Sequence, residues 1–374
     1  MRCEASKGIC RILAALQISA LLTVGSVNAE STARWTTLSG EPPLVIAHRG
    51  ASGHRPEHTL ASYELAIEFG ADFIEPDLVA TKDGHLVARH EPLIDATTDV
   101  SAHPEFASRK TTRVLDGKEV TGFFVSDFTL QEIKTLRAVQ PNPARAKTYD
   151  GKYEIPTFEE ILDLLERTNA KRSRPIGVYP ETKHPAFHLA LGLPLEDRLL
   201  DALRKHHLEG ATAPVFIQSF ESANLQYLRG KTTTRQVQLM DDGALLFDAS
   251  GKVVVGVKIP DHGDKRGGAS PTTLADIARY ANAIGPWKRQ ILVDKGLESL
   301  VPTTVIQQAH AAGLLVHTYT FRNEPAMLAP QYRGDPLLEY QQIFGMGIDG
   351  VFSDFPDTAL KARSHFLPRS PGED

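Results

Sequence analysis

The sequence predicts a single (β/α)8 barrel, and three observations lead to that prediction. Eight short apolar runs suit buried strands, helix-like segments lie between most of them, and polar residues follow the ends of many runs. Strands that alternate with helices pair in parallel through right-handed crossovers, and eight such units favour a closed barrel over an open sheet. The expected strands are Leu44–Ala47, Phe73–Val79, Ile176–Glu181, Val215–Ser219, Gln236–Met240, Gln290–Val293, Leu314–Thr320 and Gly350–Ser353.

The first 29 residues differ in character from the rest of the chain. Three basic residues precede an apolar run over 12–27, and Val27-Asn28-Ala29 supplies a small-x-small pattern. These features are typical of a secretory signal peptide that is cleaved. A membrane anchor is the alternative, but polar residues interrupt the run, and a spanning helix needs about 20 strongly apolar residues. We therefore expect residues 1–29 to be removed, a secreted, periplasmic protein, and a barrel domain over 30–374 without stable membrane insertion.

The amino-acid composition excludes several classes of function. Both cysteines, Cys3 and Cys10, lie in the predicted signal, so the mature chain would have none. This excludes a disulfide framework and thiol catalysis, and it suits an oxidising compartment. The whole chain carries a formal net charge of −5 and has no dominant basic patch, so we do not expect nucleic acid as a partner.

Helices are expected between the strands. Thr59–Phe69 places four apolar residues on one face at helical spacing. Thr157 and Glu160 form the pattern of an N-terminal capping box for a helix over 158–167. The remaining expected helices are Glu196–His206, Glu221–Leu228, Pro271–Ala283 and Val301–Ala312.

The alternation breaks after the second strand. Asp83-Gly84 between two apolar runs is a hairpin signal, so the second strand should fold back and deliver His90. Residues 95–154 then lack a regular period, apart from a helix-like piece near Leu130–Leu136. We expect this stretch to be an insertion on the catalytic face.

Polar residues gather at the carboxyl ends of the strands, where such barrels carry their chemistry. His48 and Arg49 end the first strand. Glu75 and Asp77 point the same way in the second, because strand side chains alternate with a period of two, and Glu181 and Lys183 repeat this spacing. Later strands add Gln218, Phe220, His317, Tyr319 and Asp354.

The roles of some residues stay open at this point. Unpaired carboxylates are costly to bury, so Glu75 and Asp77 in an apolar run indicate a metal site. Glu57 could cap the Thr59 helix, orient a catalytic base or take part in the site. His317 and Tyr319 could equally fill the barrel. The rim is the expected place of His54, His58 and His184.

Several motifs together resemble the glycerophosphodiester phosphodiesterase family. Val45-Ile-Ala-His48-Arg49-Gly50-Ala51-Ser52, followed by Pro56-Glu57-His58-Thr59, resembles the signature of that family. The Tyr-Pro pair before Glu181, the signal peptide and the insertion resemble the periplasmic branch of Gram-negative bacteria. The resemblance covers nearly all of the mature chain and continues in Gly70–Val79, Thr81–Val87, Gly177–Lys183, Gln218–Phe220 and Gly350–Asp357.

The resemblance implies hydrolysis of small glycerophosphodiesters to an alcohol and sn-glycerol 3-phosphate. It makes His48 and His90 the acid–base pair. Its metal ligands are Glu75, Asp77 and Glu181, and its phosphate contacts are Arg49 and Lys183. We expect Glu57, Gln218, Phe220 and Tyr319 as further substrate-binding residues. Three carboxylates suit one divalent metal of the hard type, calcium first and magnesium as the alternative. The chain departs from the family pattern at His58, where many members have Asn, and at His317–Thr320, where Trp is frequent.

The sequence leaves details of the mechanism and two other functions open. Two histidines can divide the roles of base and acid near neutral pH, and either could start as the base. The nucleophile could be water or the glycerol 2-hydroxyl. A lipid-cleaving phosphodiesterase of the phospholipase D or C type would need an exposed apolar rim, for which Phe123-Phe124 is the one candidate pair. A surface protein that binds through this fold is the non-catalytic alternative, against which the complete set of catalytic positions argues.

Overall fold

The computed structural model describes residues 35–247, 252–257, 270–294 and 299–366. The predicted signal peptide at residues 1–29 lies outside this part of the chain. All described residues belong to one compact unit, Ala33–Asp374. Within the described ranges, no helix is both long enough and apolar enough to cross a membrane.

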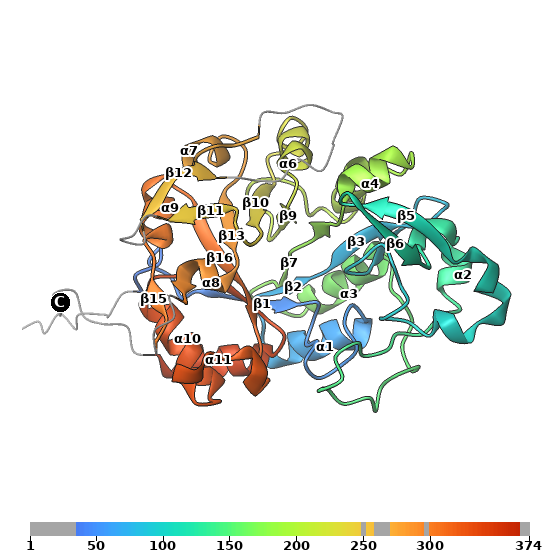
Figure 1. Cartoon of the computed structure of the whole chain (residues 1–374), viewed down its shortest axis with the longest axis horizontal. Coiled ribbons are helices and arrows are strands. Elements are labelled where there is room, and N and C mark those ends of the chain that lie inside the picture. Colours follow the sequence, from blue (N-terminus) through green and yellow to red (C-terminus); the bar gives the residue numbers. More distant parts are fainter. Residues whose placement is uncertain (1–34, 248–251, 258–269, 295–298, 367–374) are drawn as a thin grey trace, which may run out of the picture. The chain divides into compact units, whose positions relative to one another are not determined.

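Eight parallel strands close into a barrel, which confirms the predicted fold (Figure 1). The ring closes because the first strand pairs in parallel with both the last strand and the second, and each strand between pairs with the next. The second and third strands are each interrupted and count as two pieces. In order the strands are β1 (Leu44–His48), β2 (Phe73–Glu75) with β3 (Asp77–Ala80), β7 (Gly177–Val178) with β8 (Glu181–Thr182), β9 (Phe216–Ser219), β10 (Arg235–Met240), β13 (Ala283–Pro286), β16 (Leu315–Phe321) and β17 (Gly350–Ser353).

The predicted sixth strand, Gln290–Val293, is wrong. The sixth barrel strand is β13, whereas Gln290 and Ile291 end the helix α8 (Lys288–Ile291). The next two residues, β14 (Leu292–Val293), pair antiparallel with β15 (Val301–Pro302) outside the barrel sheet. At one position of β13 packing requires glycine, because a Cβ on Gly285 would lie 2.6 Å from the Leu239 side chain. This need for a small residue comes from the neighbouring strand. It gives β13 a weak apolar pattern, so the sequence alone did not identify it as a strand.

Most predicted helices are present, and the capping box read from the sequence at Thr157 and Glu160 is confirmed. The first helix is capped by Thr59, whereas the sequence offered Glu57 as a possible cap. The Thr59 side chain accepts a hydrogen bond from the Ser62 N–H. The helix predicted over Pro271–Ala283 is wrong in length, since only α7 (Leu274–Ile277) is helical, and Val301–Ala312 shortens to α9. The other helices are α1 (Leu60–Phe69), α3 (Phe158–Asn169), α4 (Pro185–Ala190), α5 (Glu196–Lys205), α6 (Ser222–Arg229), α9 (Val305–Ala311), α10 (Pro336–Gly345) and α11 (Pro356–His365).

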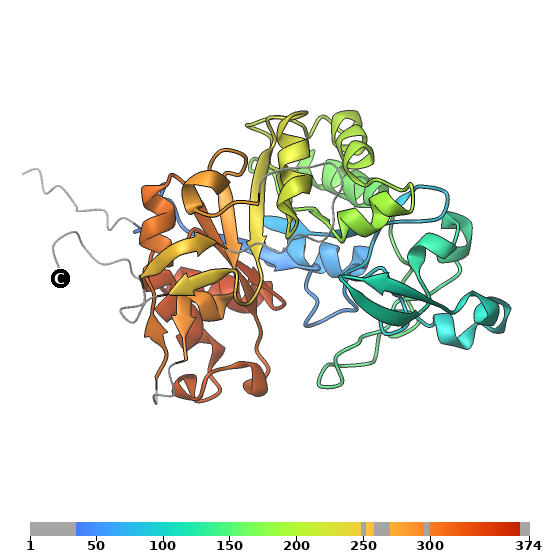
Figure 2. The ribbon, with the colours of Figure 1, turned by 45° about the horizontal axis from the view of Figure 1, so that its top comes forward.

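The segment after the second strand has more structure than its sequence suggests. The Asp83-Gly84 turn joins β3 to an antiparallel β4 (Leu86–Ala88). Residues 95–154 then contain α2 (Leu130–Ile133) and a second hairpin of β5 (Thr111–Leu115) and β6 (Lys118–Gly122). Both views show this hairpin beside α4 (Figure 1 and Figure 2). A separate apolar cluster that includes Phe106, Phe123, Phe128 and Ile133 holds the segment together.

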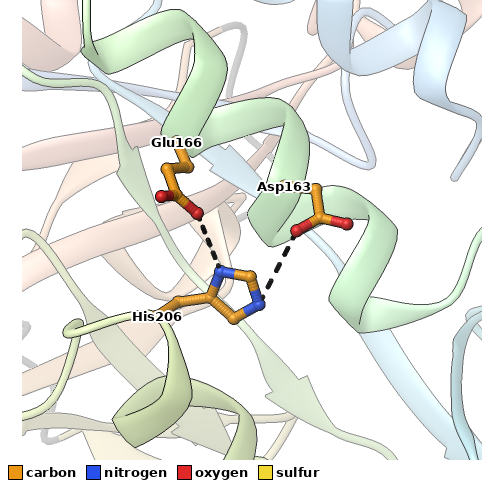
Figure 3. A group of neighbouring side chains, drawn as sticks. All are labelled: Asp163, Glu166 and His206. Atoms are coloured by element: carbon orange, nitrogen blue, oxygen red, sulfur yellow. Dashed lines mark ion pairs between the residues drawn. The ribbon is translucent and has the colours of Figure 1, made fainter.

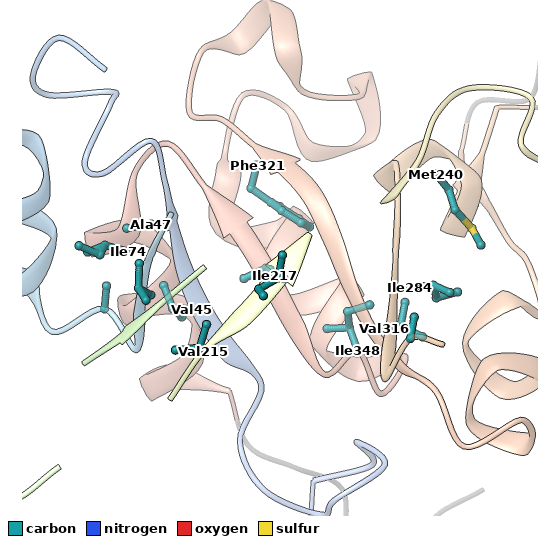
Figure 4. Packing of buried hydrophobic residues seen from close by; sticks show 14 of the residues in the cluster. Val45, Ala47, Ile74, Val215, Ile217, Met240, Ile284, Val316, Phe321 and Ile348 are labelled. Atoms are coloured by element: carbon teal, nitrogen blue, oxygen red, sulfur yellow. The ribbon is translucent and has the colours of Figure 1, made fainter. Parts of the chain in front are cut away.

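Side chains of the barrel strands alternate between two cores. Val45 and Ala47 belong to the larger cluster between the strands and the surrounding helices (Figure 4). Ile46, between them, belongs to the cluster that fills the barrel. The barrel-filling residues are Ile46, Phe73, Tyr179, Phe216, Val237, Ala283 and Phe352.

Gly177→Ala is expected to destabilise the barrel. A Cβ at Gly177 would lie 2.2 Å from the Phe73 ring and 2.6 Å from the Pro214 carbonyl oxygen. The backbone oxygen cannot move aside without shifting a neighbouring strand, and overpacking of this kind typically costs about 1–3 kcal/mol. Urea unfolding should show a lower midpoint for this variant. Gly230→Ala is the matched control, because its nearest contact would be an ordinary 3.4 Å; equal midpoints for the two variants would contradict the argument.

Candidate active site

Alternation along the strands places polar side chains at the barrel mouth, next to the apolar side chains that fill the barrel core. A barrel-filling residue is followed two positions later by a polar one on the same face. Register then sets the neighbours: His48 pairs with Glu75, Asp77 with Glu181, and Glu181 with Gln218. The barrel-filling and polar pairs are Ile46 and His48, Phe73 and Glu75, Tyr179 and Glu181, Phe216 and Gln218, and Phe352 and Asp354.

Three buried carboxylates meet at this mouth. Glu75, Asp77 and Glu181 each offer an oxygen within 4.8 Å of the others. Burial, followed by the charges of Asp77 and Glu181, raises the pKa of Glu75 well above its usual value. Burial also raises the pKa of Glu181 to about 8. Asp77 Oδ1 is buried and has no hydrogen-bond partner among the described residues. The cluster therefore fits a cation with oxygen ligands.

Neighbouring side chains fix these carboxylates. Gln218 Nε2 donates to Glu75 Oε1 over 2.9 Å, and the Arg49 backbone N–H donates to Glu75 Oε2 over 2.7 Å. Lys183 Nζ lies 2.8 Å from Glu181 Oε1. Of the residues predicted to bind substrate, Arg49, Gln218 and Lys183 thus contact the carboxylate cluster directly.

His58 does not lie at the rim as predicted. It is fully buried, with Nε2 2.9 Å from Asp77 Oδ2 and Nδ1 2.8 Å from the Tyr63 hydroxyl. Burial alone would raise the pKa of Asp77, but the hydrogen bond from His58 and the charge of Lys183 hold it well below its usual value. His58 therefore helps to keep one carboxylate of the cluster ionised.

Arg49 is held in place by Glu57. Its backbone is left-handed, with φ 59°, and its Nη1 donates to Glu57 Oε2 over 3.0 Å. Burial would raise the pKa of Glu57, but the charge of Arg49 lowers it to about 2. Glu57 is absent from the described lining of the main cavity, so its contact is with Arg49. The buried Arg89, which sequence reasoning missed, donates to the backbone oxygens of Glu57 and His58.

His48 is oriented by Asp354. Its Nδ1 lies 2.6 Å from Asp354 Oδ1, and the same carboxylate accepts hydrogen bonds from Arg322 and Arg145. Burial and the charge of Arg49 lower the pKa of His48 despite the opposing effect of Asp354. A neutral His48 that donates from Nδ1 keeps a lone pair on Nε2. The position of Asp354 after the eighth strand was a sequence signal for this role, whereas Arg145 in the insertion had none.

His90 is the second histidine of the mouth. Its Nδ1 lies 2.8 Å from Glu91 Oε1, and its Nε2 lies 3.4 Å from Lys183 Nζ. Burial, then the charges of Arg49 and Lys183, lower the pKa of His90 to about 4. Like His48, it is therefore neutral at pH 7 and has its Nδ1 on a carboxylate.

One cavity of about 1160 Å³ joins most of these groups. Phe220 and Tyr319 form part of its wall with their rings 6.1 Å apart, and the Tyr319 hydroxyl donates to the Met240 carbonyl. Lys183 lines an adjoining cavity of about 230 Å³. The predicted site residues that line the main cavity are His48, Arg49, Glu75, His90, Glu181, Gln218, Phe220 and Tyr319.

Two other histidine sites do not belong to this cavity. His317 is fully buried inside the barrel, and its Nδ1 lies 2.7 Å from the Tyr179 hydroxyl oxygen. On the outer surface, His206 lies between Asp163 and Glu166 (Figure 3). Both of these carboxylates are exposed. Exposed ion pairs of this kind contribute little, and we treat the group as a surface cluster.

The fold and the site define a (β/α)8-barrel protein equipped for acid–base chemistry on a phosphate ester: two histidines paired with carboxylates, a buried arginine and an acidic cluster at one mouth. The chain belongs to the glycerophosphoryl diester phosphodiesterase family, which it matches over residues 48–358. This confirms the family resemblance seen in the sequence.

Individual relatives agree with the family. Glycerophosphodiester phosphodiesterase GDPD6 of Arabidopsis thaliana is 38% identical over 326 residues, 84% of each chain. Glycerophosphodiester phosphodiesterase of Haemophilus influenzae is 29% identical over 370 residues, 93% of this chain and 97% of the relative.

Two solved structures share the fold. A putative glycerophosphoryl diester phosphodiesterase of Silicibacter pomeroyi is 21% identical, with a TM-score of 0.60 over 88% of this chain and 97% of that one. An Oleispira antarctica phosphodiesterase in complex with the product sn-glycerol-3-phosphate is 20% identical, with a TM-score of 0.53 over 88% and 99%.

Proposed function

We propose that this protein hydrolyses glycerophosphodiesters to an alcohol and sn-glycerol 3-phosphate with the help of one divalent cation. The observation that carries the proposal is the convergence of His48, His90, Arg49 and the carboxylate cluster in one cavity. The relatives named above supply the substrate class, and the product named for the Oleispira structure agrees with it.

The basic residues would bind the phosphodiester. Arg49 donates from Nη1 to Glu57, and its buried Nε lies 3.6 Å from Asp77 Oδ2, which leaves Nη2 for a substrate in the cavity that Arg49 lines. Charge-assisted bonds from a guanidinium to phosphate oxygens are strong and directional. Lys183 pairs with Glu181 and adds positive charge next to His90. Phe220 and Tyr319 offer aromatic faces to the carbon skeleton.

His48 and His90 would share the proton transfers. Each histidine has Nδ1 on a carboxylate, which fixes its ring. This leaves Nε2 of His48 for a reacting group, and Nε2 of His90 would meet the phosphodiester beside Lys183 Nζ, which lies 3.4 Å away. One neutral histidine takes the proton of the nucleophile, and the other gives a proton to the leaving alcohol oxygen. The histidine that acts as acid must first gain a proton, which a nearby anionic phosphodiester favours.

Glu75, Asp77 and Glu181 would hold the cation, and we propose calcium rather than magnesium. Calcium accepts six to eight oxygen ligands with flexible geometry, whereas magnesium is usually held by one or two carboxylates. Three convergent carboxylates next to an open cavity fit the first description better. When bound, the cation polarises the phosphoryl group and neutralises developing charge.

We also propose that the protein is exported to the periplasm. The support is the sequence of residues 1–29 and the lack of cysteine after them. Cell fractionation, together with N-terminal sequencing of the mature protein, would test this: an intact N-terminus in the cytoplasm would contradict it.

The function is tested by product release. Purified protein incubated with glycerophosphocholine should release sn-glycerol 3-phosphate, measured with a coupled glycerol-phosphate dehydrogenase assay. Chelation with EDTA should stop the release, and calcium should restore it more fully than magnesium. A wild-type rate that chelation leaves unchanged would contradict the role of the metal, and no release under any metal condition would contradict the function.

A lipid substrate is the second candidate. The Phe123–Phe124 pair that suggested an apolar rim is buried in the insertion. However, Trp287 and Met327 line the main cavity with 37% and 44% exposure. Release of choline or phosphocholine, measured with lysophosphatidylcholine and with glycerophosphocholine as substrates, distinguishes the two candidates: faster turnover of the lipid than of glycerophosphocholine would favour the second.

A further inference from the structure

A chain of ionic contacts runs from His90 to the tip of the insertion hairpin. Glu91 joins His90 Nδ1 through Oε1 over 2.8 Å and His184 Nε2 through Oε2 over 3.4 Å. His184 Nδ1 in turn lies 3.1 Å from Asp116 Oδ2. Asp116 occupies the turn between β5 and β6, and His184 immediately precedes α4. The hairpin is thus linked to a histidine that the proposed function uses.

His184 is placed to hold Asp116 and Glu91 at the same time, and we call this three-residue contact the clamp. Its backbone is left-handed, with φ 43°, and both of its ring nitrogens face carboxylates. An imidazole donates from both nitrogens only when it is protonated. Burial would lower the pKa of His184, but its hydrogen bonds with Asp116 and Glu91 raise it to about 9. His184 therefore bridges the two carboxylates as a cation at neutral pH.

Without His184, Glu91 would be held in position less firmly than Asp354. Asp354, which orients His48, has a side chain only 3% exposed and accepts hydrogen bonds from two arginines. The Glu91 side chain is 44% exposed. An exposed ion pair is weak and has many competing arrangements in water. The contact with His184 restricts Glu91 and keeps Oε1 directed toward His90.

We propose that His184 and Asp116 are positioning residues for His90, and that the β5–β6 hairpin is thereby a working part of the active site. His184 holds Glu91, Glu91 holds the His90 ring, and Asp116 holds His184 from the insertion. This inference rests on the proposed function, in which His90 transfers a proton.

The clamp should loosen at alkaline pH. The titratable groups around His184 are Asp116 in the hairpin turn, Glu91 after β4, and Lys183 and His188 in its own segment. Glu221 and Asp241 line the same small cavity from across the barrel mouth. Because the folded pKa of His184 is raised, its bridge is complete below the ordinary value of 6.5 and is lost as pH rises through about 9. A neutral His184 can donate to only one of its two carboxylates.

Asp116→Asn and His184→Gln test the proposal, with glycerophosphocholine as substrate. Both should lower kcat by about 10- to 100-fold with little change in KM, the range found when a partner that orients a metal-binding histidine is removed. The wild-type kcat should fall as pH passes about 9. That fall should move to lower pH in Asp116→Asn, because one source of the raised His184 pKa is gone, and should disappear in His184→Gln. Asn keeps the left-handed backbone of position 116 without strain.

Glu119→Gln is the matched control, since it removes an exposed acid from the same hairpin and should leave kcat and its pH profile unchanged. The double variant Asp116→Asn/His184→Gln should be no slower than His184→Gln alone, because the two residues act through one contact. Wild-type kcat and pH profile in Asp116→Asn would overturn the inference. So would a loss that is equal at every pH and accompanied by a lower Tm. If His184→Gln does not fold, the kcat and pH profile of Asp116→Asn alone test the inference.

The same measurements separate this inference from the proposed function. If the wild-type protein releases no sn-glycerol 3-phosphate, the proposed function itself fails. If the wild type is active and His90→Ala is not, while Asp116→Asn behaves as wild type, only the positioning role of the hairpin fails.

Discussion

His48→Ala and His90→Ala are each expected to lower kcat for sn-glycerol 3-phosphate release by about 10²–10⁴-fold, the usual contribution of an acid–base group. Both histidines line the main cavity, and both are neutral at pH 7 because burial lowers their pKa. Steady-state kinetics with glycerophosphocholine measures the loss. Circular dichroism should show that each variant remains folded, since both side chains lie at the barrel mouth and outside the barrel-filling cluster.

The double variant should lose less than the product of the single losses, because two groups that serve one reaction act as a unit. Asp354→Asn should resemble His48→Ala, since an amide no longer holds the His48 Nδ1–H by charge. His54→Ala is the control: this partly exposed histidine pairs with Asp357 and does not line the described walls of the main cavity. Near-normal turnover in either single variant would show that the histidine concerned is only structural.

Glu75→Gln is expected to weaken calcium binding by at least about tenfold, because affinity follows the number of charged oxygen ligands. Isothermal titration calorimetry with calcium alone measures this directly. The wild-type protein should bind calcium more tightly as pH rises from 6 to 8, because Glu181, with its pKa raised to about 8, must lose a proton to bind. Some activity of Glu75→Gln should return at high calcium concentration.

Glu166→Gln is the matched control for the metal site. It removes a carboxylate from the surface cluster around His206 and should leave calcium binding unchanged (Figure 3). Calcium should also raise the Tm of the wild type and of Glu166→Gln more than that of Glu75→Gln, because a ligand stabilises the state that binds it. Equal calcium affinity in Glu75→Gln and the wild type would show that the cation binds elsewhere.

Local periodicity was enough to predict the barrel and to choose most of the site. A period of two along a strand places His48 on the face of Ile46 and Glu181 on the face of Tyr179, whatever the rest of the chain does. The carboxyl ends of parallel strands meet at one mouth, so residues from separate strands could be grouped before any contact was known. Turn and cap chemistry is equally local, which is why the Asp83-Gly84 hairpin and the Thr157 capping box were found. The second Asp-Gly turn, Asp116-Gly117, carries the same signal and was overlooked.

Contacts between distant segments were decided by the tertiary structure alone. The sixth strand is β13, in which Gly285 has no room for a Cβ beside the Leu239 side chain of the neighbouring strand. Asp77 holds His58 in the interior, and the insertion delivers Arg145 to Asp354 from 209 positions away. The link between Asp116 and His184 joins a hairpin turn to the start of a helix. Such pairs have no period and no fixed spacing, since loops follow no repeating geometry, and their partners are chosen by packing and charge once the strands have closed.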